Sequence, residues 1–141
     1  MNSLAVNSIS ALAGSIIAMA FGGWDPLLCF FLFTIVVDYV TGLLASIKEG
    51  SGLKSDVGFW GLTRKALMLV VIVLAHQMDV LLMGGTDVLK TGAIYFYLAN
   101  ELISITENYG RLGLPMPDKL RRMIAVLKNK DSDKEKDPPK R

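Results

Sequence analysis

The chain has 141 residues, 52% of them hydrophobic, and its mean hydropathy of +0.43 is higher than an ordinary soluble domain of this size reaches. This composition predicts a single domain whose main solvent is lipid. The net charge of +2 hides an asymmetry, because residues 1–110 carry five Lys/Arg and eight Asp/Glu whereas residues 111–141 carry ten and five. The one cysteine, Cys29, excludes a disulfide framework and a cysteine-based metal site within one chain.

Four apolar windows approach the length of about 20 residues that a helix needs to cross the bilayer. The first contains no charge but is diluted by Asn and Ser, so it is the weakest candidate of the four. We therefore expect an all-α integral membrane protein with three or four transmembrane helices, a C-terminal amphipathic helix and a disordered charged tail. The transmembrane domain is expected over residues 1–110, with helices at about 4–23, 27–47, 66–83 and 88–106.

The first window carries small residues at intervals of four, which place them on one face of a helix. Small residues let two helix backbones approach closely in lipid, so this face is expected to meet another helix. The pattern leaves open whether that helix belongs to the same copy or to a second one. The face consists of Ser10, Gly14, Ala18 and Gly22.

The second window has an acid near its centre, Asp38, which shares a helix face with Thr34, Thr41 and Gly42. An ionised carboxylate at the bilayer centre costs about 2.5–3.5 kcal/mol, so it must face protein, water or a proton. We interpret this face as part of a pore or polar path, with Gly42 as a packing position. The alternative is an acid that only holds helices together.

The last two windows contain further polar residues. Glu101 in the fourth window shares a face with Ser104 and Asn108. As for Asp38, we interpret this face as part of a pore or polar path. His76 and Asp79 in the third window are spaced to share a helix face, but two ligands do not make a metal site. We expect neither a metal nor a cofactor, and we expect a monomer of four short helices to struggle to satisfy these polar faces.

Lys and Arg in short loops stay on the cytoplasmic side and so set the orientation. The connection over residues 48–65 holds four of them and the tail holds ten, whereas the turn over residues 22–26 has none. Both basic regions are cytoplasmic if the third and fourth windows each cross once. The C-terminus is then cytoplasmic, and so is the N-terminus if the first window also crosses.

A short basic amphipathic helix is predicted after Pro117, followed by a tail over residues 129–141 that has nothing apolar to bury. Such a helix suits the anionic inner leaflet, although it equally suits packing against the ends of the membrane helices. Its apolar stripe is Leu120, Met123, Ile124 and Leu127, flanked by the basic residues Lys119, Arg121 and Arg122.

Three strings of the sequence resemble the patterns of one holin family, found in phages of Gram-positive bacteria and including the toxin-secretion holins of clostridia. They are DYVTGLLAS (38–46), KSDVGFWGLTRKALML (54–69) and NELISITENYGRLGLPMPDKL (100–120). The corresponding positions are Asp38, Gly42, Gly58, Gly61, Lys65, Asn100, Glu101, Ser104, Glu107, Asn108, Pro115 and Pro117.

The resemblance implies a homo-oligomer in the host cytoplasmic membrane that opens lesions for a cell-wall endolysin, without direct contact with it, and so causes host lysis or toxin release. It implies no nucleic-acid partner. The chain has no GxSxG, HExxH, P-loop or GxGxxG spacing, so we expect no enzymatic activity. The alternatives are a small ion channel or transporter subunit, and a non-lethal membrane scaffold or anti-holin.

Overall fold

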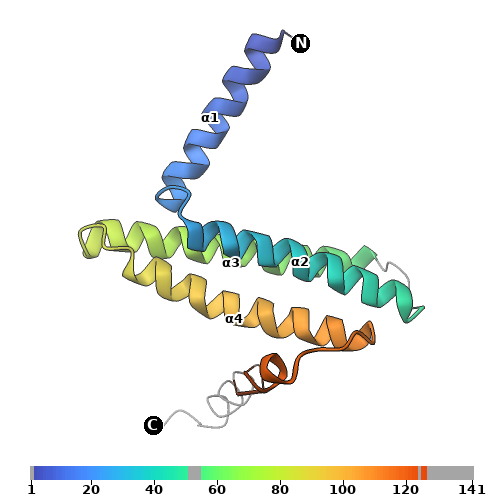
Figure 1. Ribbon diagram of the computed structural model, residues 1–141. Coiled ribbons are helices and arrows are strands. Elements are labelled where there is room, and N and C mark those ends of the chain that lie inside the picture. Colours follow the sequence, from blue (N-terminus) through green and yellow to red (C-terminus); the bar gives the residue numbers. More distant parts are fainter. Residues whose placement is uncertain (1, 51–54, 124, 127–141) are drawn as a thin grey trace.

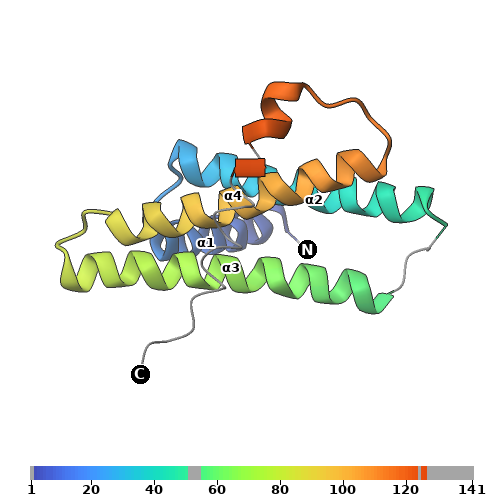
Figure 2. The same cartoon turned by 90° about the horizontal axis from the view of Figure 1, so that it is seen from below.

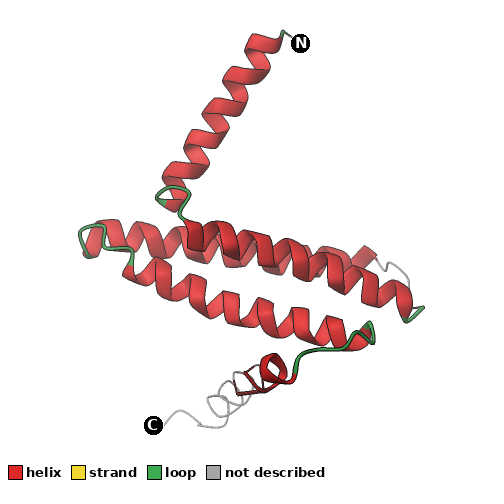
Figure 3. Ribbon diagram, in the orientation of Figure 1, coloured by secondary structure: helices red, strands yellow, loops and turns green. Residues whose placement is uncertain are grey.

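The computed structural model describes residues 2–50, 55–123 and 125–126, and these ranges contain helices and turns without a strand (Figure 3). The expectation of an all-α protein is confirmed. A short helical segment over residues 118–123 follows the last long helix. The four long helices are α1 (Ser3–Phe21), α2 (Pro26–Lys48), α3 (Ser55–Leu82) and α4 (Val88–Arg111).

Two helices are longer than the apolar windows that predicted them. Helix α3 begins at Ser55 rather than at Ala66, and α4 continues to Arg111 rather than ending near Thr106. Hydropathy marks only the most apolar part of a helix, and the polar turns that flank this part were assigned to loops. The assignment of Arg64 and Lys65 to a connecting loop is therefore wrong, because both belong to α3.

Local chemistry explains where the first two helices end and begin. Gly22 adopts a left-handed conformation at the end of α1, with φ of 74°, and the N–H of Gly23 donates to the carbonyl of Ala18 at 2.7 Å. Helix α2 then starts with Pro26 at its first position, and the carboxylate of Asp25 accepts the N–H of Leu28 at 2.8 Å. The turn between α1 and α2 is consequently tight.

Helices α2, α3 and α4 form a bundle in which α2 and α3 both pack mainly on α4 (Figures 1 and 2). We call the end that carries the 22–25 and 83–87 turns the turn end, and the end with Lys48 and Arg111 the tail end. The apolar core lies in the half toward the turn end. Its fully or nearly buried members are Leu28, Phe31, Ile72, Ile94 and Leu98.

Helix α1 projects away from this bundle (Figure 1). It has no buried residue, and it contacts α3 only near its own C-terminal end. There the side-chain amide of Gln77 donates to the carbonyl of Ala20 at 3.4 Å, and the ring of His76 lies over Gly22. A Cβ atom at position 22 would lie 2.2 Å from Cε1 of His76, so glycine permits this contact.

Three helices in the described part of the chain have the length and hydropathy of membrane spans: α1, α2 and residues Gly58–Leu82 of α3. Their mean hydropathies are 1.8, 2.2 and 1.9 respectively. Helix α4 does not qualify, since it carries Lys90, Glu101, Glu107 and Arg111. The sequence interpretation ranked the first window as the weakest span, and this ranking is wrong, because α4 is the least apolar of the four.

Candidate functional site: an ionic cluster inside the bundle

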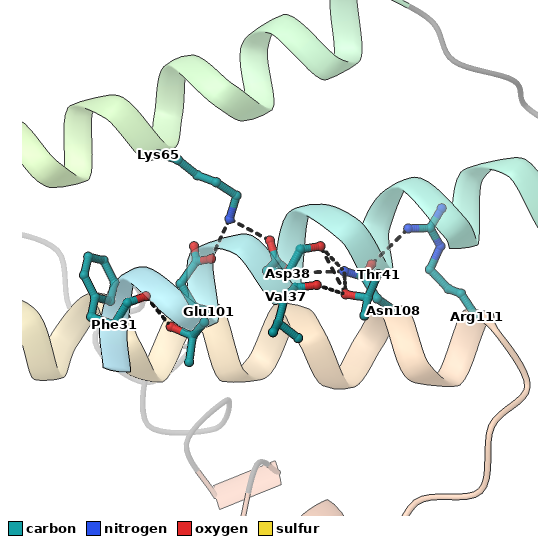
Figure 4. Close-up of polar contacts among 9 residues, drawn as sticks. Phe31, Val37, Asp38, Thr41, Lys65, Glu101, Asn108 and Arg111 are labelled. Carbon is teal, nitrogen blue, oxygen red and sulfur yellow. Dashed lines mark hydrogen bonds and ion pairs between the residues drawn. The ribbon is translucent and has the colours of Figure 1, made fainter. Parts of the chain in front are cut away.

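The centre of the site is Lys65, which extends from α3 toward two carboxylates on the other two helices (Figure 4). Its ammonium nitrogen Nζ lies 2.7 Å from Oδ2 of Asp38 on α2 and 2.5 Å from Oε2 of Glu101 on α4. All three residues are buried, with exposed fractions of 8%, 8% and 3% for Lys65, Asp38 and Glu101. One cation thus ties the three helices of the bundle together.

Asn108 connects this ion cluster to the contact between α2 and α4. Its side-chain amide donates to Oδ1 of Asp38 at 3.0 Å and lies 3.2 Å from the hydroxyl of Thr41 (Figure 4). Gly42 makes the approach possible, because a Cβ atom there would lie 3.3 Å from Nδ2 of Asn108. The small residue of α2 therefore faces a polar residue of α4 within the same copy.

The polar contacts continue to the tail end of the bundle. Arg111 donates to the side-chain carbonyl of Asn108 at 3.2 Å and forms a two-point pair with Glu49, at 2.9 and 2.7 Å. The hydrogen bond from Arg111 holds the pKa of Glu49 below its ordinary value and raises the pKa of Arg111. Lys48 also donates to the carbonyl of Leu112, so α2 and α4 are clamped where both end.

The cluster lies near the middle of the helices. At a rise of about 1.5 Å per residue, Asp38 is about 18 Å from the start of α2 and about 15 Å from its end. Burial of an ion pair is costly unless its geometry is good and the remaining polar atoms are hydrogen-bonded. Within the described residues no buried side-chain nitrogen or oxygen lacks a partner. The buried polar side chains of these faces are therefore satisfied within one copy, contrary to the expectation for them.

A second polar cluster closes the turn end. Lys90 is 2% exposed, and its ammonium lies 2.7 Å from Asp25 and 3.9 Å from Asp87. Burial by itself raises the pKa of Asp25, but the hydrogen bonds from Lys90 and Leu28 and the charge of Lys90 outweigh it, so the pKa is lowered.

His76 and Asp79 have separate partners in this second cluster. Nδ1 of His76 is 2.9 Å from Oδ1 of Asp87, whereas the carboxylate of Asp79 accepts the N–H groups of Leu89 and Lys90 at 3.0 and 2.8 Å. Asp79 of α3 thus caps the start of α4 from a neighbouring helix. The described residues hold no group of three His, Cys, Asp or Glu side chains arranged like metal ligands.

A cavity of about 280 Å³ opens beside the central ion cluster. Asp38, Lys65 and Glu101 lie on its wall, together with Ser104 and Asn100 of α4. Gly61 leaves room on the α3 side, because a Cβ atom there would meet nothing within 4 Å. Its remaining lining residues are Arg64 and Met68.

The structure brings together polar residues that were predicted on two separate helices, from the second and the fourth apolar window. Asp38, Thr41, Glu101 and Asn108 meet in one cluster, while the buried hydroxyl of Thr34 donates to the carbonyl of Phe31 at 2.7 Å. It does not give Ser10, Gly14 and Ala18 a packing partner, since no residue of α1 is buried. The short helical segment after Pro117 exposes its described members of the predicted basic amphipathic helix, which are Lys119, Leu120, Arg121, Arg122 and Met123. Ile124 and Leu127 lie outside the described residues.

The sequence interpretation missed Lys65 as a site residue. Two acids at similar depths in separate apolar windows imply a buried cation, because unpaired charge is expensive in lipid. Lys65 becomes a candidate for this cation when the third helix is extended toward Ser55. It is also one of the positions that carry the family resemblance. The sequence analysis used the positive charge of Lys65 only as an indicator of orientation in the membrane.

The helices and the ion cluster together define a multi-pass α-helical membrane protein. The bacteriophage holin family matches residues 15–129, which include all of α2, α3 and α4. This match shows that the chain belongs to the bacteriophage holin family. Family membership and three apolar helices make it a multi-pass protein of the cytoplasmic membrane.

The chain is also similar to proteins of several bacteria and of a phage. The chain is 40% identical over 127 residues to an uncharacterized protein of Halalkalibacterium halodurans, covering 87% of this chain and 93% of the relative. It is 42% identical over 117 residues to an uncharacterized 14.9 kDa protein of Clostridium perfringens, covering 83% and 88%. A protein of Bacillus phage phi105 described as a probable holin is 32% identical over 103 residues, covering 72% and 75%. No solved structure matches the chain.

Proposed function

We propose that the protein is a holin that oligomerises in the bacterial cytoplasmic membrane and forms lesions through which an endolysin reaches the cell wall. The observation that carries this proposal is the family match over residues 15–129, because it spans the whole bundle that holds the ion cluster. Lysis of a phage host or release of a toxin would both follow from the same lesion.

The internal pairing of charge supports a protein that accumulates without leaking. Each carboxylate of the central cluster faces Lys65 rather than lipid, so a single copy is compatible with an intact bilayer. Formation of a lesion requires polar surface that faces water. In our proposal the faces of Asp38, Thr34 and Thr41 on α2 and of Glu101, Ser104 and Asn108 on α4 supply this surface when copies assemble.

The orientation in our proposal places the tail end in the cytoplasm. Arg64 and Lys65 no longer count as loop charges because both belong to α3, but Lys48 at the end of α2 and Lys54 in the following connection remain, and residues 111–141 contribute ten Lys/Arg. The exposed basic residues Lys119, Arg121 and Arg122 then face the anionic inner leaflet. With α1 and α4 both crossing, four spans place the N-terminus in the cytoplasm as well.

The proposal is tested by inducing the full chain in bacteria with and without a co-expressed endolysin that lacks its own export signal. We expect abrupt lysis only when both are present, and loss of membrane potential with the chain alone. The matched control is an endolysin with an inactivated catalytic residue, which removes cell-wall cleavage but leaves the lesion. Saturable, ion-selective flux without passage of the endolysin would contradict the holin proposal and favour a channel. Harmless expression in both strains would favour a scaffold or anti-holin.

The role of the central cluster is tested within the same assay. Asp38→Asn keeps the size of the side chain but removes its charge next to Lys65 and one of the two oxygens that accept from Lys65 and Asn108. We expect a changed lysis time at equal abundance in the membrane fraction. Asp118→Asn removes an exposed carboxyl outside the bundle and serves as the matched control, for which lysis time is unchanged. Equal timing of wild type and Asp38→Asn would remove Asp38 from the lytic step.

A further inference from the structure

Arg64 is a charged residue in an otherwise apolar, exposed row of α3. At helical spacing it shares this row with Trp60, Leu67, Val71 and Leu74, which are 69%, 59%, 41% and 57% exposed. Arg64 is itself exposed, and within the described residues it takes part in no ion pair or hydrogen bond. Its neighbour Lys65, in contrast, is buried between two carboxylates.

The depth of Arg64 makes its exposure costly. Arg64 lies nine residues into α3, about 14 Å from Ser55, at the level of the central cluster. Arg64 lines the cavity beside the central cluster but forms no ion pair with any described residue, and charged residues inside a membrane normally pair with one another or face water. Within one copy Arg64 therefore has no carboxylate partner, because the nearby carboxylates pair with Lys65.

The cavity next to Arg64 offers this partner. Arg64, Asp38 and Glu101 all line it. The two carboxylates share the single cation Lys65, so the cluster holds more carboxylates than cations. A cavity of about 280 Å³ beside the open position of Gly61 has room for an inserted side chain.

We propose that a second copy of this chain docks on this face, so that Arg64 of each copy enters the cavity of the other and pairs with its Asp38 and Glu101 carboxylates. Donor and acceptors lie on the same face, so a two-fold arrangement satisfies both copies at once. The proposal rests on the oligomerisation in the proposed function and assigns the face through which it occurs. It pairs the exposed cation Arg64, which has no ionic partner in one copy, with two carboxylates that share a single cation.

The face is tested by cross-linking the full chain in bacterial membranes. Cys29→Ser removes the native thiol, and Leu67→Cys then places a single thiol in the apolar row one turn from Arg64. We expect a short bis-maleimide to give a dimer with Leu67→Cys and not with Leu62→Cys, which is exposed on the opposite side of α3. A dimer formed by Leu62→Cys and not by Leu67→Cys would overturn the assignment of the face.

The ion pair is tested by adding Arg64→Gln or Arg64→Lys to the Leu67→Cys chain. We expect Arg64→Gln to lower the dimer yield about fivefold or more at equal membrane abundance, because an interhelical polar contact in lipid is lost. Arg64→Lys keeps the charge and should retain most of the yield. Equal yields for Arg64→Gln and the parent would overturn the proposal, since water or lipid then satisfies Arg64. Because cross-linking is measured without endolysin, a protein that dimerises in this way but does not lyse cells would contradict only the proposed function.

Discussion

Helix α1 is apolar but hardly packed, whereas helix α4 is less apolar and lies at the centre of the bundle. Helix α1 has a mean hydropathy of 1.8 and qualifies as a membrane span, yet none of its residues is buried. Helix α4 does not qualify, yet α2 and α3 both pack on it and it contributes Lys90, Glu101 and Asn108 to the two polar clusters. Apolar composition shows which helix tolerates lipid on all sides. It does not show which helix organises the bundle.

This difference follows from the forces that hold helices together in lipid. Burial of apolar surface gains little when the alternative solvent is equally apolar, so packing depends on close approach and polar contacts. Helix α4 has both, through Gly42 opposite Asn108 and through Lys65 between Asp38 and Glu101. Helix α1 has small residues for close approach but no helix beside them within one copy.

The largest effect is expected from Lys65→Met, which breaks the cluster that makes α4 central. It leaves Asp38 and Glu101 buried without a cation, which costs about 3–5 kcal/mol. We expect loss of the protein from the membrane fraction and a lowered unfolding midpoint in detergent. The control replaces all three residues by Asp38→Leu, Lys65→Met and Glu101→Leu, which should restore abundance because no charge is left unpaired. A stable Lys65→Met protein would show that the cluster does not hold the bundle together.

Gly42→Leu is expected to have the next largest effect, because it acts on the contact of α4 with α2. The added side chain must displace Asn108, whose amide nitrogen lies 3.3 Å from the position of a Cβ atom. We expect a loss of about 1–3 kcal/mol in the free energy of unfolding, measured in detergent micelles. Unchanged stability would mean that α2 and α4 do not approach each other as closely as the structure shows.

Gly14→Leu is the matched substitution in α1, where a Cβ atom would meet nothing within 4 Å. We expect the unfolding midpoint of the bundle to stay that of the wild type. If the small face of α1 meets another copy, the yield of cross-linked oligomers in membranes should fall at the same time. A lowered midpoint would show that α1 packs on the bundle of its own copy.

The smallest effect is expected at the pair of Glu49 and Arg111, which joins α2 and α4 at the surface. The pKa of Glu49 is lowered in the folded protein by the hydrogen bond from Arg111. Its contribution to stability is therefore present above the pKa of an unfolded glutamate and is lost as the pH falls through the folded pKa. Glu49→Gln should flatten the acid limb of stability against pH slightly and reduce its dependence on salt. Identical acid limbs would show that the pair contributes nothing.

The sequence predicted the four helices and the acids Asp38 and Glu101, because hydropathy and the cost of intramembrane charge are local properties. It did not predict that Lys65 joins them, since the polar first turns of α3 read as a loop and its partners lie 27 and 36 residues away. The face of Gly42 was recognised, but its partner Asn108 could not be chosen from spacing alone. The role of Asp79 as a cap for α4 was also hidden, because the cap comes from another helix.

We propose that α4 crosses the membrane despite its composition, because its buried charged residues Lys90 and Glu101 are both paired with groups on other elements of the same copy. Reporter fusions after Gly85 and after Lys130 test this directly, since only the crossing of α4 separates the two positions. We expect the fusion after Gly85 to be external and the fusion after Lys130 to be cytoplasmic. Both reporters on the same side of the membrane would contradict the account.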